Sequence, residues 1–263
     1  YTRQGEGSPI LLIHDLNVCS CSYEWNHVKR ILSSNHTVYT IDLLGCGNSD
    51  KPNLTYTNYL YVQLILDFIK DVIGEKTDIV SSGASSGILL MACSVQNDWI
   101  DKAVLVNPEN LLIYSKTPDK FAELYRTVIC TPIIGTFLYN IMVNKKTIEK
   151  DFRLDYYYDQ NKITEKDIMY FYEASQKQHT KGKYLYANIN SCFTNTNIIH
   201  GLRNITQPIY IFTGKENPEN ILAANQYQNY LPDTHIIELE KTKRFPHMER
   251  PEDFTENLES LYL

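Results

Sequence analysis

The chain has 263 residues, of which 43% are hydrophobic and 21% charged, a composition typical of a globular protein and not of a disordered chain. Its formal net charge of −6 argues against nucleic acid as a partner, because binding to phosphates requires a basic surface. No apolar run approaches the roughly 18 residues that cross a bilayer, so no transmembrane segment is expected.

The sequence contains cysteines without the spacing of a metal site, since none form a C-x-x-C pair or a zinc-type pattern. They are Cys19, Cys21, Cys46, Cys93, Cys130 and Cys192. Reduced thiols in a cytoplasmic or cytosol-facing location are therefore expected, and neither a metal nor a cofactor is predicted. The chain begins at Tyr1 and not at methionine, so an upstream segment is expected; whether it was a signal, an anchor or a tag is open.

Strands and helices alternate along the N-terminal part of the chain. Short apolar runs predict buried strands, and apolar residues at helical spacing predict the helices between them. The predicted strands are residues 8–14, 37–42, 78–80 and 102–106, and the predicted helices are residues 23–32, 58–73 and a segment from 88 to 95 and beyond. This alternation indicates an α/β fold with a right-handed, mostly parallel doubly wound sheet and helices on both faces.

Residues 83–87, Gly-Ala-Ser-Ser-Gly, lie between a predicted strand and a predicted helix. They match G-x-S-x-G, the pattern of a strained strand-to-helix turn that exposes a nucleophilic serine. The pattern makes Ser85 a candidate nucleophile. Small residues in a serine-rich turn can also satisfy this pattern by chance.

Several motifs stand in the order seen in the α/β-hydrolase fold family, which the chain resembles over essentially its whole length. They are Ile13-His14, the turn at 42–52 (similar to D-x-x-G-x-G-x-S-D-x-P), residues 83–87, Val-Leu-Val-Asn-Pro at 104–108, and the tail at 245–252. The resemblance implies an eight-stranded sheet, here without its first strand or two, and a helical cap inserted after the strand that ends at Asn107.

The resemblance divides the chain into a core of residues 1–110 and 205–263 and a cap of residues 111–204. The cap is predicted to contain helices, and the core to resume with two strands. The predicted cap helices are residues 120–128, 133–144, 146–152 and 165–175, and the strands are residues 208–214 and 235–239. The tyrosines of the cap could line an apolar pocket or simply pack the cap. Residues 132–139 could alternatively lie on a membrane surface, although they carry no cationic face.

Three positions depart from the family pattern. Where the family has G-x-x-D, residues 214–217 end in Asn217, which cannot supply the charge of the acid. Where the family tail reads G-H-x-P, Arg244 replaces the histidine, and arginine cannot act as a base at neutral pH. The His-Gly that precedes the family's oxyanion hole reads His14-Asp15, and a carboxylate there would oppose a developing negative charge.

The register of the turn is open. Counted without gaps from residue 76, the family pattern puts Gly83 at the nucleophile position. Placing Ser85 there requires a longer strand and a later start of the helix. Substitutes for the missing groups are His247 as base and Glu109 or Glu216 as acid, since Glu109 stands where some family members carry an alternative acid. Each of these residues could instead have only a structural role near a helix start or in a loop, and for His247 the structural role is the favoured interpretation.

Two functions follow from these residues. In the first, the protein is a serine hydrolase of a small or medium ester-like substrate. Its candidate residues are Ser85, His247, Glu109 and Glu216, with the backbone N–H groups of Leu16 and Ser86 as oxyanion donors. In the second, the triad is degenerate and the protein binds a small apolar or ester-like molecule, or another protein, with Arg244 available to hold an anionic group.

Overall fold

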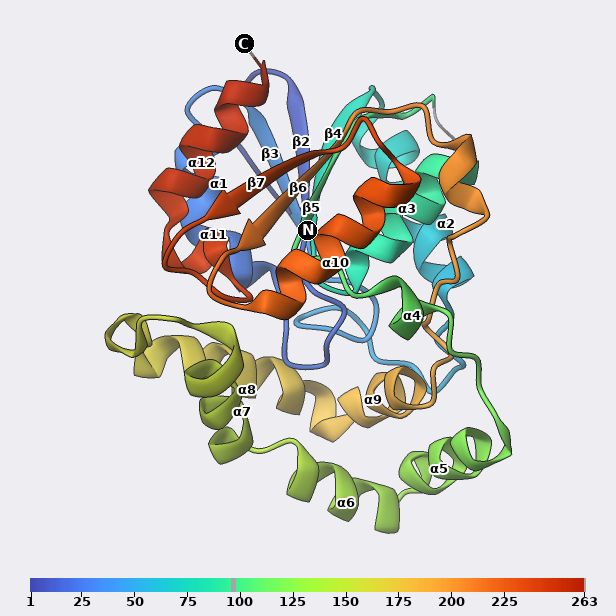
Figure 1. Cartoon of the computed structure of the whole chain (residues 1–263). Helices are drawn as coiled ribbons and strands as arrows, with labels where there is room; N and C mark the ends of the chain where they lie inside the picture. The colour runs from blue at the N-terminus through green and yellow to red at the C-terminus, as the bar shows by residue number, and fades with distance from the viewer. Residues whose placement is uncertain (96–97, 263) are drawn as a thin grey trace.

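The computed structural model describes residues 1–95 and 98–262. Among these residues a seven-stranded sheet runs in the order β1-β3-β2-β4-β5-β6-β7 (Figure 1). Its strands are β1 Thr2–Gln4, β2 Pro9–Ile13, β3 Thr37–Ile41, β4 Thr77–Ser82, β5 Ile100–Val106, β6 Ile209–Gly214 and β7 His235–Leu239. Only β1 pairs antiparallel, with β3. The predicted doubly wound, mostly parallel sheet is confirmed, and β1 is a short edge strand that was not predicted.

The central strands are buried on both faces, which explains their continuous apolar sequences. In β2, Leu11 and Ile13 pack into the core shared with α2 and α3, whereas Ile10 and Leu12 pack into the core shared with α1 and α12. The helices around the sheet are η1 Ser22–Trp25, α1 Asn26–Leu32, α2 Asn58–Phe68, η2 Ile69–Ile73, α3 Ser85–Val95, α10 Pro218–Tyr230, α11 Pro246–Glu249, α12 Pro251–Glu259 and η6 Ser260–Tyr262. The predicted continuation of α3 past residue 95 lies outside the described residues.

The segment between β5 and β6 is helical, as predicted. It contains α4 Leu111–Tyr114, α5 Lys120–Cys130, α6 Ile134–Met142, α7 Lys145–Asp151, η3 Phe152–Tyr156, η4 Gln160–Lys162, α8 Glu165–Thr180, α9 Gly182–Asn190 and η5 Gly201–Asn204. Figure 1 shows α5 to α9 gathered in one layer below the sheet, and we call these five helices the cap helices. The helix α9 was not predicted.

Apolar side chains are exposed on α5 and on the turn and helix that follow it. Phe121, Ile133 and Phe137 are 81%, 83% and 65% exposed. No single helix of the described chain is long and apolar enough to cross a membrane; α5 and the helical segment from Ile134 to Tyr156 pass that test only as a pair bent by 100°. Contact of residues 132–139 with a membrane surface stays a prediction.

Candidate functional site

The turn between β4 and α3 has Gly83 at its apex. The φ angle of Gly83 is +52°, in the left-handed region that glycine adopts without strain. Ser85 already belongs to α3, is 0% exposed, and donates from Oγ to the carbonyl oxygen of His14 at 2.6 Å. The expectation that Ser85 stands at the exposed apex is therefore wrong. The chain adopts the register that is counted without gaps from residue 76, in which Gly83 holds the nucleophile position.

The carboxylate of Asp15 fills the space in front of this turn. Its Oδ1 accepts the N–H of Ala84 at 2.8 Å, and a Cβ built on Gly83 would lie only 2.3 Å from the same oxygen. Asp15 thus occupies the place that a side chain at the apex would need. The N–H of Ser86, expected as an oxyanion donor, donates to the carbonyl of Gly83 at 3.1 Å, and Leu16, the other expected donor residue, is buried in the core.

Arg244 joins two carboxylates at this turn. Its guanidinium lies 2.8 Å from Asp15 Oδ2 and 2.9 Å from Glu109 Oε1. Burial alone would lower the pKa of Arg244, but the two carboxylates raise that pKa well above its usual value, so the group is a permanent cation and cannot serve as a base. We call Asp15, Glu109 and Arg244 the Arg244 cluster; it carries one positive and two negative charges.

Asn107 fixes the loop that presents Arg244. Its Nδ2 donates to the carbonyl oxygens of Lys243 and Arg244 at 2.9 and 2.7 Å, and its Oδ1 accepts the N–H of Gly214 at 3.0 Å. Asn107 follows β5 with a φ of 44°, a conformation that asparagine tolerates better than most residues. The ends of β5 and β6 and the loop after β7 are thereby tied together around the Arg244 cluster.

His247 lies in a second, fully buried network. Its Nε2 lies 3.0 Å from Glu24 Oε1, and its ring stacks on Trp25 with centroids 4.1 Å apart. The same oxygen of Glu24 accepts the hydroxyl of Ser82, and Glu24 Oε2 accepts the N–H of Asp15 at 3.2 Å. His247 is 0% exposed, and its described hydrogen-bond partner is Glu24 and not Ser85, so the structure does not bring the expected base to the expected nucleophile.

The remaining predicted acid position is also outside the cluster. Glu216 is exposed and accepts the N–H of Lys241 at 3.2 Å. Asn217 caps α10 by accepting the N–H of Glu219 at 3.0 Å. Of the candidate site residues, the structure therefore pairs only Glu109 with Arg244. Glu24 was missed, because a glutamate in a short helix gives no local signal that it is buried.

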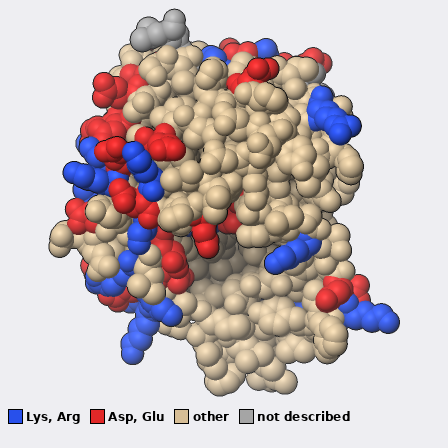
Figure 2. Space-filling model, viewed as in Figure 1, with Lys and Arg blue, Asp and Glu red and all other residues tan. Residues whose placement is uncertain are grey.

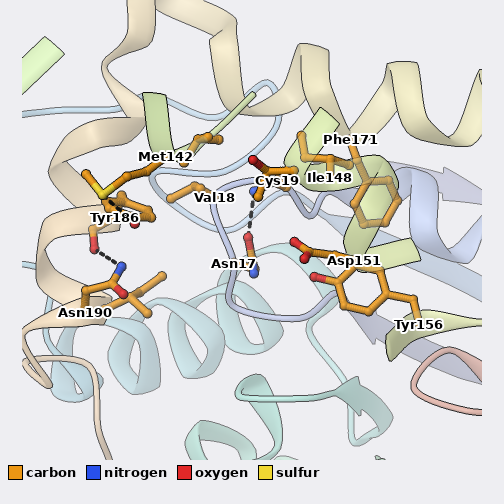
Figure 3. Close-up of a pocket in the computed structure, with 13 residues that line it drawn as sticks. Asn17, Val18, Cys19, Met142, Ile148, Asp151, Tyr156, Phe171, Tyr186 and Asn190 are labelled. Atoms are coloured by element: carbon orange, nitrogen blue, oxygen red, sulfur yellow. Dashed lines mark hydrogen bonds between the residues drawn. The ribbon is translucent and has the colours of Figure 1, made fainter. Parts of the chain in front are cut away.

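A cavity of about 260 Å³ lies between the cap helices and the loop that follows β2 (Figure 3). Most of its wall is apolar. The lining residues are Asn17, Val18, Cys19, Met142, Val143, Thr147, Ile148, Asp151, Tyr156, Phe171, Tyr186, Ile189 and Asn190. Burial raises the pKa of the Cys19 thiol to about 12, so this residue is protonated at neutral pH and is a poor nucleophile.

Further open space lies beside the Arg244 cluster. Glu109 and Arg244 line a cleft of about 580 Å³ between the loop after β5 and α10. Figure 2 shows this side of the molecule hollowed between the sheet above and the cap helices below, with acidic atoms at the edge of the hollow. The site thus combines space for a ligand with fixed charges, but the described residues that line the cleft include no serine, threonine or cysteine.

Replacing Gly83 by alanine is expected to lower the free energy of unfolding by at least about 1–2 kcal/mol, the cost of a left-handed conformation in a residue with a Cβ. The contact with Asp15 adds to this cost. In a background that already carries Asp15→Gly, the same replacement is expected to cost less, which a double-mutant cycle from urea unfolding measures. Purely additive effects would contradict the close approach of Asp15 to the apex.

A model of the family described as "Alpha/beta hydrolase family" matches residues 10–257. A 2-hydroxy-6-oxo-6-(2'-aminophenyl)hexa-2,4-dienoic acid hydrolase of Metapseudomonas resinovorans is 28% identical over 43% of this chain and 40% of its own length. A haloalkane dehalogenase of Agrobacterium fabrum is 42% identical over 21% of this chain and 17% of its own length. The chain therefore spans less than half the length of these curated relatives.

Solved structures resemble the whole chain. Cfl2 from Burkholderia cenocepacia superposes with a TM-score of 0.80 at 11% identity, covering 99% of this chain and 90% of that one. A meta-cleavage product hydrolase from Pseudomonas fluorescens gives a TM-score of 0.77 at 17% identity, covering 99% and 92%. At these identities the likeness shows the fold.

Proposed function

Because the chain belongs to the alpha/beta hydrolase family, we propose that it uses the fold of this family to bind a small molecule, without the family's serine-based chemistry. The observation that carries the proposal is the position of Asp15. Its carboxylate accepts the N–H of Ala84 and fills the space that a side chain on Gly83 would take. A negative charge there opposes the oxyanion that acyl transfer must stabilise.

The electrostatics of the Arg244 cluster support the same proposal. Acyl transfer by a serine needs an imidazole that accepts a proton and a carboxylate that orients it. Arg244 stands where the family carries that imidazole and is held as a cation by Asp15 and Glu109. A permanent cation paired with two carboxylates can fix a loop, but it cannot accept and return a proton during a reaction.

Hydrolysis of an ester-like substrate is the second candidate. It is favoured by the similarity to proteins named as hydrolases and by the literal G-x-S-x-G at residues 83–87. For this function Ser85 would have to release the carbonyl of His14, to which its hydroxyl is bonded, and reach a base. The geometry therefore favours binding over hydrolysis.

Intact-mass analysis after incubation with a fluorophosphonate separates the two candidates. We expect no adduct on the wild-type chain under conditions that fully label a known serine esterase, because Ser85 is buried and its hydroxyl is bonded to a carbonyl oxygen and not to a base. A single adduct that disappears in Ser85→Ala would overturn the proposal and establish the hydrolase. Ligand-dependent thermal stabilisation without turnover is the positive signature of a binding protein.

A further inference from the structure

We propose that the cavity between the cap helices and the loop after β2 binds a small organic cation, an amine carried on an apolar body, with Asp151 as its counter-ion. This inference rests on the proposed binding function and names the class of ligand. It follows from three features of the cavity: a carboxylate without a partner, a lining without a basic side chain, and an apolar wall.

The first feature is the carboxylate of Asp151, the last residue of α7. It lines the cavity, and within the described part of the chain its side chain makes no hydrogen bond or ion pair. Figure 3 shows this carboxylate close to the hydroxyl of Tyr156 and facing the side of the cavity where Asn17 lies. Asp151 is half-buried, so water still reaches part of its carboxylate, but partial burial already makes an opposite charge beside it favourable. A bound cation would supply the missing partner.

The second feature is the charge of the lining. Of the thirteen residues around the cavity, Asp151 is the charged one, and no lysine or arginine is among them. Burial, and after it the nearby charge of Asp155, raise the pKa of Asp151 by more than the charge of Lys150 lowers it, so the charge of Asp151 is only partly compensated. An anionic ligand would meet an uncompensated negative charge, so the cavity discriminates against carboxylates and phosphates.

The third feature is the set of apolar and aromatic side chains that line the cavity around the carboxylate. Val18, Ile148 and Phe171 offer surface for the body of a ligand, and the rings of Tyr156 and Tyr186 also line the cavity. Aromatic faces attract cations through the ring quadrupole, so they add to the preference set by Asp151. The volume of about 260 Å³ lies below the roughly 300–1,000 Å³ of typical drug-sized pockets, which favours a compact ligand.

Phenethylamine, phenethyl alcohol and hydrocinnamate test this inference, because they share a phenyl body and differ in the charge of the head group. Isothermal titration calorimetry at pH 7 should give at least about tenfold tighter binding of the amine than of the alcohol, and no binding of the carboxylate. In Asp151→Asn the amine should lose this advantage while the affinity for the alcohol is unchanged. Asp71→Asn, in η2 of the core, is the matched control, since Asp71 is exposed and does not line the cavity.

Equal affinity of the wild-type chain for the amine and the alcohol would overturn the cation inference while leaving a binding function intact. An amine preference that survives in Asp151→Asn would overturn the role of Asp151. Absence of binding by all three probes would also overturn the inference. Fluorophosphonate labelling of Ser85 would instead remove the proposed function itself, so the two failures are distinguishable.

Discussion

Arg244→Leu is expected to lower the free energy of unfolding by about 3 kcal/mol, the lower end of the range for removing one partner of a buried ion pair. Asp15 is 3% exposed at its side chain, and Glu109 and Arg244 are each about a quarter exposed. Without the guanidinium, two carboxylates would face each other with no compensating charge. Urea unfolding followed by circular dichroism at pH 7 measures the loss.

Two controls isolate the cause. Arg153→Leu removes an exposed pair with Glu149 one helical turn away, and is expected to change stability by less than about 0.5 kcal/mol. Combining Arg244→Leu with Asp15→Asn and Glu109→Gln should recover part of the loss, because neutral amides leave no bare charge. If Arg244→Leu costs no more than Arg153→Leu, the Arg244 cluster contributes nothing to stability.

The strands of the sheet could be predicted because the segments with continuous apolar sequence are the segments that the fold buries. A segment such as β2, Pro9–Ile13, is apolar throughout since helices cover both faces, and this is visible without any knowledge of the partners. The strand β1, Thr2–Gln4, is exposed at an edge and carries no such pattern. The helix α9 has its buried positions Leu185 and Ala187 among tyrosines and asparagines, which weakens the helical signal in the sequence.

The site was predictable only in part. The sequence identifies Asp15, Asn217 and Arg244 as departures from the family pattern, and the gap-free register correctly places Gly83 at the apex. It could not identify the Arg244 cluster, because residues 15, 109 and 244 come from three loops that only the sheet brings together. The G-x-S-x-G match misled, since Ser85 belongs to the first turn of α3 and its hydroxyl serves the packing of that turn.

Glu24→Leu is the second replacement with a large expected effect, about 4 kcal/mol of lost stability. Glu24 is 1% exposed and provides the acceptor oxygens for the hydroxyl of Ser82, the N–H of Asp15 and the ring of His247. Each buried donor left without an acceptor costs roughly 1–3 kcal/mol, and a leucine offers none. The measurement is again the free energy of unfolding in urea, with near-ultraviolet circular dichroism reporting on the packing of Trp25.

Glu24→Gln should lower the free energy of unfolding by less than Glu24→Leu does. The amide oxygen of glutamine can still accept one hydrogen bond, whereas its NH₂ group cannot accept from the remaining donors. Glu123→Ala, at an exposed position of α5, is the matched control and should change stability by less than about 0.5 kcal/mol. Adding Ser82→Ala and His247→Phe to Glu24→Leu removes two of the donors that have lost their acceptor. The triple variant should therefore recover part of the lost free energy of unfolding. A Glu24→Leu chain as stable as the wild type would mean that this network does not hold the loop of Asp15, and the fixed position of that carboxylate would need another cause.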